Sequence, residues 1–315
     1  MPEFIREDKR NKNRELDQQA ALESRAQKFL EYPKDPELLG LLEKIDFNLL
    51  GNIFREVGRS CGINGDKINF LNPERIAHIS INAGTLAELA SELNIIAVDP
   101  REFKKYMEER GLPIDLALLA IVVHEEAHAV SRRVCEEFGS GKEVRVGYEH
   151  SMRPDEMRMA ELLGGKAKTV FEVFNEGVTE KFAEEVFLEY IRRSSYININ
   201  DAEVFLKNYR QNASNNLSLA KALVDTLIQR IGRETEINQK LVWQSLVRGL
   251  FEAESFIDEE LRVLFAEMFS PDFLRRLSRL PQDKKEMKRM EGEIKGKSIR
   301  ALITYLSRKS RWNRK

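Results

Sequence analysis

An apolar stretch, residues 116–123, runs directly into the pentapeptide His124-Glu125-Glu126-Ala127-His128. Such a stretch predicts a buried helix. On a helix, residues four apart lie about 40° apart around the axis and one turn apart along it. The imidazoles of His124 and His128 can therefore hold one divalent metal at a Zn–N distance of about 2 Å. Glu125 is rotated by about 100° from His124, so it can reach a metal-bound water without binding the metal. This is the HExxH signature of zinc hydrolases, in which the Glu is the general base.

A second pair of residues completes the expected site. Structural zinc sites have four protein ligands, whereas catalytic sites have three and leave the fourth position to water. Residues 169–183 have apolar positions at helical spacing, and Glu176 and Glu180 lie four apart on one face of that helix. Glu176 can bind the metal. Glu180, one turn away, can accept the outward N–H of a ligand His and so fix its tautomer.

These two motifs together resemble those of a known family. HExxH followed by Asn175-Glu176 and Glu180 on a second helix resembles the gluzincin metallopeptidases, and among them the small bacterial minigluzincins. The resemblance covers residues 66–232. It implies a peptidase with one Zn²⁺ per chain bound by His124, His128 and Glu176, with Glu125 as the base and Glu180 orienting a His. It also implies an edge strand between the two helices, which residues 144–148 resemble.

Two features depart from the family pattern. Glu126 is charged where most metallopeptidases have an uncharged residue, and we expect it to point away from the His pair as a solvated or paired surface residue. The gap from His128 to Glu176 is also longer than in thermolysin-like enzymes. We expect the additional residues to form the strand and a charged segment around 153–156, a candidate loop over the cleft.

Amide hydrolysis also requires a group that stabilises the oxyanion. No His follows Glu176 in the chain, so a histidine from the C-terminal part is excluded. Tyr209, on the first long helix after the metal-binding one, is the first candidate, and Tyr148 and His150 are alternatives. The strand at 144–148 is in turn a candidate to pair with an extended substrate backbone by strand addition.

Composition excludes several classes of protein. Charged residues make up 33% of the chain and hydrophobic ones 42%, which is typical of a soluble, helix-rich protein. No apolar run is long enough for a membrane span and the first residues lack a signal-peptide core, so we expect a cytoplasmic protein without membrane contact. Cys61 and Cys135 are too few for a disulfide framework, and Cys135 is expected to be a small buried packing residue close to the His stripe of the helix. A net charge of −1 gives no general attraction to nucleic acid.

The hydrophobic pattern predicts most of the other elements. We expect a charged lead up to about residue 28, one helix over 35–63, short strands at 67–70, 75–81 and 94–98, and a helix from Pro100 to Arg110. His78 is expected to be an ordinary strand residue. The active-site helix is expected to be capped by Asp115 and to end at residues 139–141. Further helices are predicted at 201–231, 236–250 and 252–268, followed by a solvated basic segment, 283–315, with twelve basic and four acidic residues.

The predicted fold class is α+β and mostly helical. We expect a zincin-like catalytic domain of two subdomains, with a small mixed sheet and the active-site helix in one, a helical lower subdomain that supplies Glu176, and the metal at their junction. The expected boundaries are 1–63 for a charged N-terminal helical segment, 64–250 for the catalytic domain and 251–315 for a helical extension. The predicted function is zinc-dependent hydrolysis of a peptide or protein substrate. The alternatives are a metal-bearing pseudoenzyme or regulatory binding protein without turnover, and a helical adaptor in which HExxH is accidental.

Overall fold

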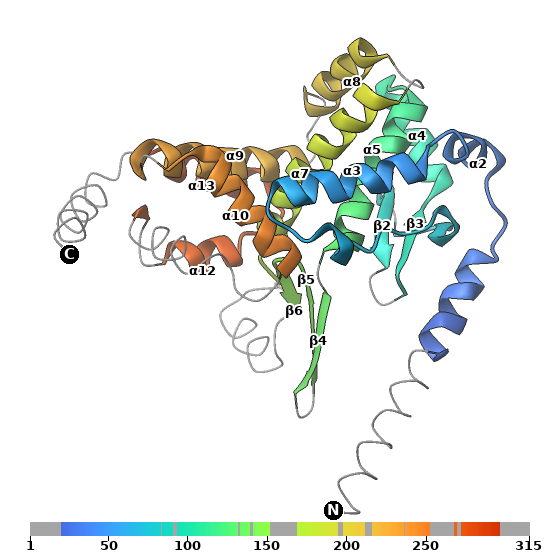
Figure 1. Cartoon of the computed structure of the whole chain (residues 1–315), viewed down its shortest axis with the longest axis horizontal. Coiled ribbons are helices and arrows are strands. Elements are labelled where there is room, and N and C mark those ends of the chain that lie inside the picture. The colour runs from blue at the N-terminus through green and yellow to red at the C-terminus, as the bar shows by residue number, and fades with distance from the viewer. Residues whose placement is uncertain are drawn as a thin grey trace, which may run out of the picture. The chain divides into compact units, whose positions relative to one another are not determined.

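The computed structural model describes residues 20–82, 84–90, 93–131, 133–138, 141–151, 169–194, 198–211, 216–235, 237–252, 268–269 and 272–296 (Figure 1). The chain divides into two compact units. The first contains residues 1–48 and 70–129, and the second contains residues 49–69 and 130–315. The described part is α+β and mostly helical, as the sequence predicts. Each unit has its own small sheet.

The first unit contains a three-stranded mixed sheet in the order β1 (Ile76–His78), β3 (Ile95–Val98), β2 (Ala87–Ala90). Strand β1 runs parallel to β3, and β2 runs antiparallel to it. Every residue of β3 is buried, as expected for the central strand. The helices of this unit are residues 20–30, α2 (Pro36–Leu42), α4 (Pro100–Arg110) and most of α5 (Ile114–Val130).

Helix α4 shows how local sequence sets the ends of an element. Asp99 is its N-cap, and the Asp99 carboxylate accepts the N–H groups of Arg101 and Glu102. Pro100 follows at the first helical position, where a missing N–H costs nothing. Gly111 ends the helix in the left-handed conformation. The predicted bounds of this helix are confirmed.

Helix α5 is apolar on nearly every side, and every residue from Ile121 to Val130 is buried. Asp115 lies inside its first turn, where its carboxylate accepts the N–H of Leu116, so the prediction that Asp115 caps the helix is wrong. The helix also ends at Val130, well before the predicted stop at 139–141. Residues 133–138 form a strand instead, because they pair with residues 141–146 as a hairpin.

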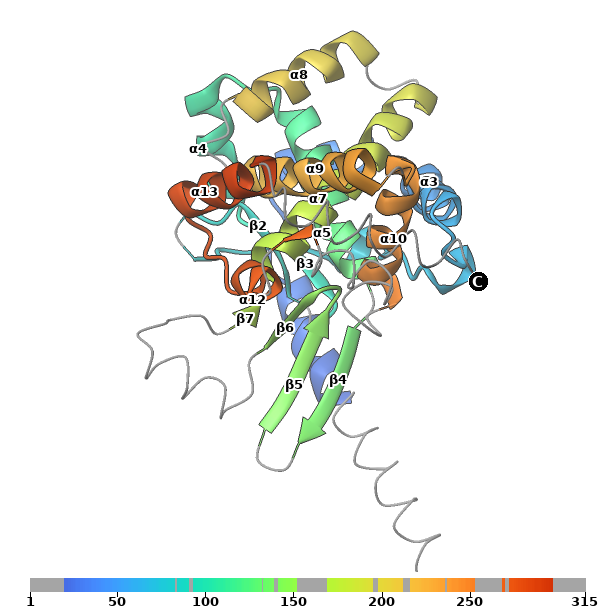
Figure 2. The ribbon, with the colours of Figure 1, turned by 90° about the vertical axis from the view of Figure 1, so that its left-hand side faces the viewer.

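The second unit combines most of α3 (Phe47–Ser60) with a four-stranded antiparallel sheet and a group of helices (Figure 2). The sheet order is β4 (Arg133–Phe138), β5 (Gly141–Val146), β6 (Glu149–Ser151), β7 (Thr169–Val170). The helices are α7 (Glu172–Arg193), α8 (Ile199–Gln211), α9 (Asn216–Thr235), α10 (Gln239–Glu252), α12 (Phe273–Ser278) and α13 (Lys284–Lys295). Helix α7 packs against α8, α9, α10 and α12, and α13 lies along α9.

Gly177 explains the close packing of α7 on α9. A Cβ atom at this position would lie 2.4 Å from the carbonyl oxygen of Ala220 and 2.8 Å from a methyl group of Val224. Any larger residue at 177 would therefore push the two helices apart. This contact fixes the first turns of α7, which carry Glu176.

Several predicted elements differ from the structure. The helix predicted over 35–63 is two helices, α2 and α3. The strand predicted at 67–70 is absent: Lys67 ends a 3₁₀ turn over residues 65–67, and residues 68–70 belong to no strand. Strand β2 was not predicted. The segment 201–231 is divided between α8 and α9, and α9 continues through Gly232 to Thr235, because one interior Gly costs only about 1 kcal/mol. The loop at 153–156, most of the helix at 252–268 and the tail after 296 lie outside the described residues.

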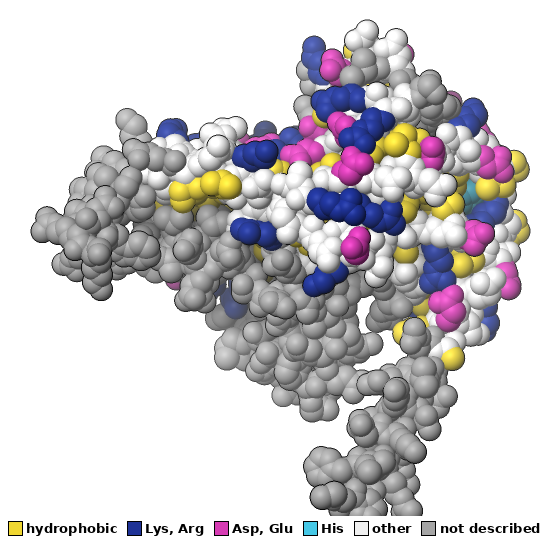
Figure 3. Space-filling model, viewed as in Figure 1, with side chains coloured by type: hydrophobic (Ala, Val, Ile, Leu, Met, Phe, Trp, Pro, Cys, Tyr) yellow, Lys and Arg dark blue, Asp and Glu magenta, His cyan; other side chains and the backbone are white. Residues whose placement is uncertain are grey.

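The surface of the described residues is mixed in charge. On the face drawn in Figure 3, basic and acidic side chains are interspersed over the coloured part of the molecule. Among the described residues, no helix combines the length and apolar character that crossing a membrane requires.

His78 is a strand residue, as predicted, but it is buried and its contacts are specific. Its Nδ1 accepts the backbone N–H of Asp35 at 2.8 Å, so the proton of the neutral ring lies on Nε2. That Nε2 is buried and has no hydrogen-bond partner among the described residues. Burial, and then the nearby charge of Lys34, lower the pKa of His78 from 6.5 to about 4.

We therefore expect His78 to destabilise the fold in acid. Between pH 6.5 and 4 the unfolded chain binds a proton at His78 that the folded chain does not, so stability falls as pH falls through this window. The loss reaches about 3 kcal/mol near pH 4. His78→Asn retains an acceptor for Asp35 but does not titrate, so urea unfolding at pH 7 and pH 4 should show a smaller acid loss in the variant. An equal loss in both proteins would contradict the assignment.

Candidate metal centre

The last two turns of α5 carry His124 and His128, which are 7% and 9% exposed. Their Nε2 atoms lie 3.2 Å apart and their rings are inclined at 78°. Two nitrogen ligands of a tetrahedral Zn²⁺, each at about 2.1 Å from the metal, lie about 3.4 Å from one another. The two imidazoles thus have the separation that a shared metal requires, as the i, i+4 spacing predicts.

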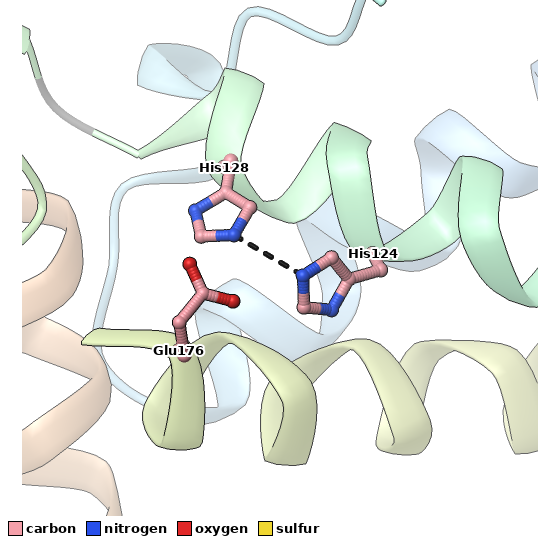
Figure 4. A group of neighbouring side chains, drawn as sticks. All are labelled: His124, His128 and Glu176. Carbon is pink, nitrogen blue, oxygen red and sulfur yellow. Dashed lines mark hydrogen bonds between the residues drawn. The ribbon is translucent and has the colours of Figure 1, made fainter. Parts of the chain in front are cut away.

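Glu176 completes a group of three possible ligands. Each of His124, His128 and Glu176 offers one ligand atom, and these atoms all lie within 4.8 Å of one another. Figure 4 shows the Glu176 carboxylate pointing toward the two imidazole rings. The group could hold a metal ion. Two imidazoles and one carboxylate are the donor set of thermolysin-type catalytic zinc sites.

Glu125 and Glu180 have their predicted places along the two helices. Glu125 follows His124 on α5 and is 8% exposed. Glu180 lies one turn after Glu176 on α7 and is partly buried. The proton transfer expected of Glu125 and the contact with a ligand His expected of Glu180 stay predictions.

Glu126 is not a solvated surface residue, so that prediction is wrong. Its side chain is fully buried, its Oε2 accepts the backbone N–H of Leu71 at 3.2 Å, and its Oε1 has no partner among the described residues. Burial raises the pKa of Glu126 to about 8. The reason is that α5 is buried on all sides, so the side opposite the His pair also faces protein. Glu126 therefore joins α5 to the segment that precedes β1.

Tyr148 is not available as an oxyanion donor. It is buried, and its hydroxyl donates to the carbonyl of Leu246 at 2.7 Å. Its ring also packs edge-on against Phe174, with centroids 5.0 Å apart. The strand before it is likewise engaged, because Arg145 and Val146 pair with β4 on one side and with β6 on the other. The prediction that this stretch pairs with an extended substrate is therefore wrong at these positions.

The other candidates lie on elements of the second unit. Tyr209, near the end of α8, stacks on Phe205 with centroids 5.4 Å apart, and its role as oxyanion donor stays a prediction. His150 pairs with Arg145 and Val170 in the sheet, and its side chain lies outside what the structure describes. Cys135 belongs to β4, not to the helix expected from the sequence.

A contact that the sequence did not reveal holds the β5–β6 turn on α7. Asn175, next to Glu176, accepts the backbone N–H of Tyr148 at 2.9 Å through its Oδ1. Gly147 has a φ of 59°, as the first residue of a two-residue hairpin loop often requires. A Cβ at Gly147 would also lie 2.6 Å from that same oxygen. The strand predicted over residues 144–148 includes Gly147, and nothing in the sequence indicates Asn175 as the partner of the turn.

Three comparisons with known proteins found no match to this chain. No protein-family model matches the chain, and neither a curated protein nor a solved structure matches it significantly.

We expect Tyr148→Phe to destabilise the second unit. The change leaves the ring in place but removes the donor to the buried Leu246 carbonyl, which costs about 1–3 kcal/mol. Urea unfolding should show this loss. Tyr106→Phe is the control, since Tyr106 is partly exposed and its ring contact with Arg110 needs no hydroxyl. Equal stability of Tyr148→Phe and wild type would show that the hydroxyl contributes nothing.

Proposed function

We propose that this protein is a zinc-dependent metallopeptidase. The observation that carries the proposal is the convergence of His124, His128 and Glu176, whose ligand atoms lie within 4.8 Å of one another. A His₂Glu set leaves one coordination position for water, as catalytic zinc sites do, whereas structural zinc sites are closed by four protein ligands. The resemblance of the two motifs to gluzincins adds support for peptide bonds as the substrate.

The residues around the site suit a hydrolytic mechanism. His124, His128 and Glu176 would hold the zinc ion, which would supply Lewis acidity for a water molecule and for the substrate carbonyl. Glu125, beside the first ligand on α5, accepts the proton of the attacking water at its carboxylate and later donates it to the leaving amine. Burial of both imidazoles and of Glu125 keeps bulk water away and strengthens these charge interactions.

The substrate class proposed is a peptide or protein, and the low cysteine content fits a reducing cytoplasm. The same three ligands would also serve a regulatory protein that holds zinc without turnover. A peptidase should both contain zinc and cleave peptides, whereas a regulatory protein should contain zinc and cleave none. Metal content and peptide cleavage are therefore measured separately.

We expect the purified protein to contain about one zinc per chain, measured by mass spectrometry of the metal. Glu176→Gln should weaken zinc binding strongly, because a neutral amide replaces the one anionic ligand. Glu172→Gln is a matched control, since it removes the same charge one turn earlier on α7. Full zinc content after His124, His128 and Glu176 are all changed to Ala would refute the site.

Glu125→Gln separates chemistry from metal binding. Gln has nearly the same size, but it cannot accept a proton at neutral pH. Zinc content should stay unchanged while cleavage of a broad peptide library falls by about 10²–10⁴-fold, the usual share of general-base catalysis. Wild-type protein that holds zinc yet cleaves no peptide would favour the regulatory alternative. Equal cleavage by wild type and variant would remove Glu125 from the mechanism.

A further inference from the structure

Strand β4 ends the four-stranded sheet of the second unit. The sheet order within the described residues is β4-β5-β6-β7, so β4 pairs with β5 along one edge only (Figure 2). All its residues, Arg133 to Phe138, pair in register with Gly141 to Val146. The strand contains no Pro, which would interrupt the row of donors at its other edge. Such an edge is a template for another strand.

The two hairpins determine which backbone groups face that outer edge. In a hairpin with two loop residues, the flanking residues exchange hydrogen bonds, and hydrogen-bonded pairs then alternate along the strands. Phe138 and Gly141 flank one such loop, and Val146 and Glu149 flank the other. Both loops predict the same alternation on β5: the backbone groups of residues 141, 143 and 145 face β4, and those of residues 142, 144 and 146 face β6. The N–H and C=O groups of Val134, Glu136 and Phe138 therefore face β5, and those of residues 133, 135 and 137 face outward.

We propose that β4 pairs with β4 of a second copy, so that the chain forms a two-fold homodimer through a continuous sheet. A two-fold axis perpendicular to the sheet makes the two copies of β4 antiparallel. In this antiparallel pair, each outward-facing residue (133, 135 or 137) lies opposite an outward-facing residue of the other copy. These residues are two apart, so the two-fold axis must pass through a residue and not between two residues. An axis at Cys135 places residues 133–137 of one copy opposite residues 137–133 of the other.

The charge pattern selects this register. With the axis at Cys135, Arg133 lies opposite Glu137 of the partner copy, and symmetry repeats this pair. An axis at Glu136 would place Glu136 opposite itself, and like charges directly opposite are destabilising. Within residues 133–138, an axis at Val134 would leave a shorter overlap without opposite charges. Of the three centres, only Cys135 combines the longest overlap with charge complementarity.

Charge exchange tests the register on the full chain by sedimentation velocity. Arg133→Glu should weaken self-association at least about tenfold, because it replaces two attractive pairs with two repulsive ones. The rescue variant is Arg133→Glu, Glu137→Lys, Lys142→Glu. It restores the pair between copies and also keeps opposite charges at positions 137 and 142, which pair within the hairpin. Association should return to within about threefold of wild type.

Arg145→Glu is the matched control, since it makes the same charge change on β5, which is an inner strand of the sheet. It should leave self-association unchanged. Far-ultraviolet circular dichroism and urea unfolding establish that each variant is folded. A wild-type chain that stays monomeric up to about 100 µM, a triple variant that fails to restore association, or an equal effect of Arg145→Glu would overturn the proposal.

Cross-linking tests the position of the axis. Residues in a hydrogen-bonded antiparallel pair have Cα atoms about 5.5 Å apart, within the reach of a short bifunctional maleimide. Wild-type protein should therefore give a covalent dimer through Cys135. Cys61, the other cysteine, is only 4% exposed. Cys135→Ser should abolish the cross-link while the sedimentation dimer remains. A dimer that cross-links without Cys135 would overturn this register, and so would a missing cross-link in a dimer whose Cys135 reacts with a monofunctional maleimide.

Discussion

The burial of α5 is the constraint on which the candidate site depends. Because this helix is surrounded by protein on nearly every side, the four polar residues near its end, 124–126 and 128, are all removed from water. A buried polar group is costly unless it has a partner. Glu126 has the Leu71 N–H, and the two imidazoles face each other at 3.2 Å. A shared metal would satisfy both imidazoles at once, which gives a physical reason for placing them on an apolar helix.

The second unit positions its own part of the site by close backbone contacts. Gly177 allows α9 to approach α7, and Asn175 holds the β5–β6 turn through the Tyr148 N–H. Glu176 lies between these two contacts in sequence. It is thus carried by a turn with a tertiary contact on each side, which suits a ligand whose geometry must be maintained.

The sheet of the second unit has a different consequence. Its inner strand β5 pairs with both neighbours at Arg145 and Val146, so these positions are not open to a substrate strand. The outer strand β4 instead presents alternate backbone groups and a charge pattern that is complementary to itself. Metal chemistry and self-association therefore involve separate features of the chain, and either proposal can fail without the other.

The sequence by itself determined the features that depend on local geometry. The i, i+4 spacing of His124 and His128, the ends of α4 at Asp99 and Gly111, and the strand at 95–98 all follow from neighbouring residues. Only the tertiary structure decided the burial of Glu126, the end of α5 at Val130 and the engagement of Tyr148 by Leu246 and Asn175. The contacts of Glu126 and Tyr148 join residues far apart in the chain, and the end of α5 depends on the hairpin that follows it. Periodicity records which side of a helix is apolar, but it does not record what packs against the other side.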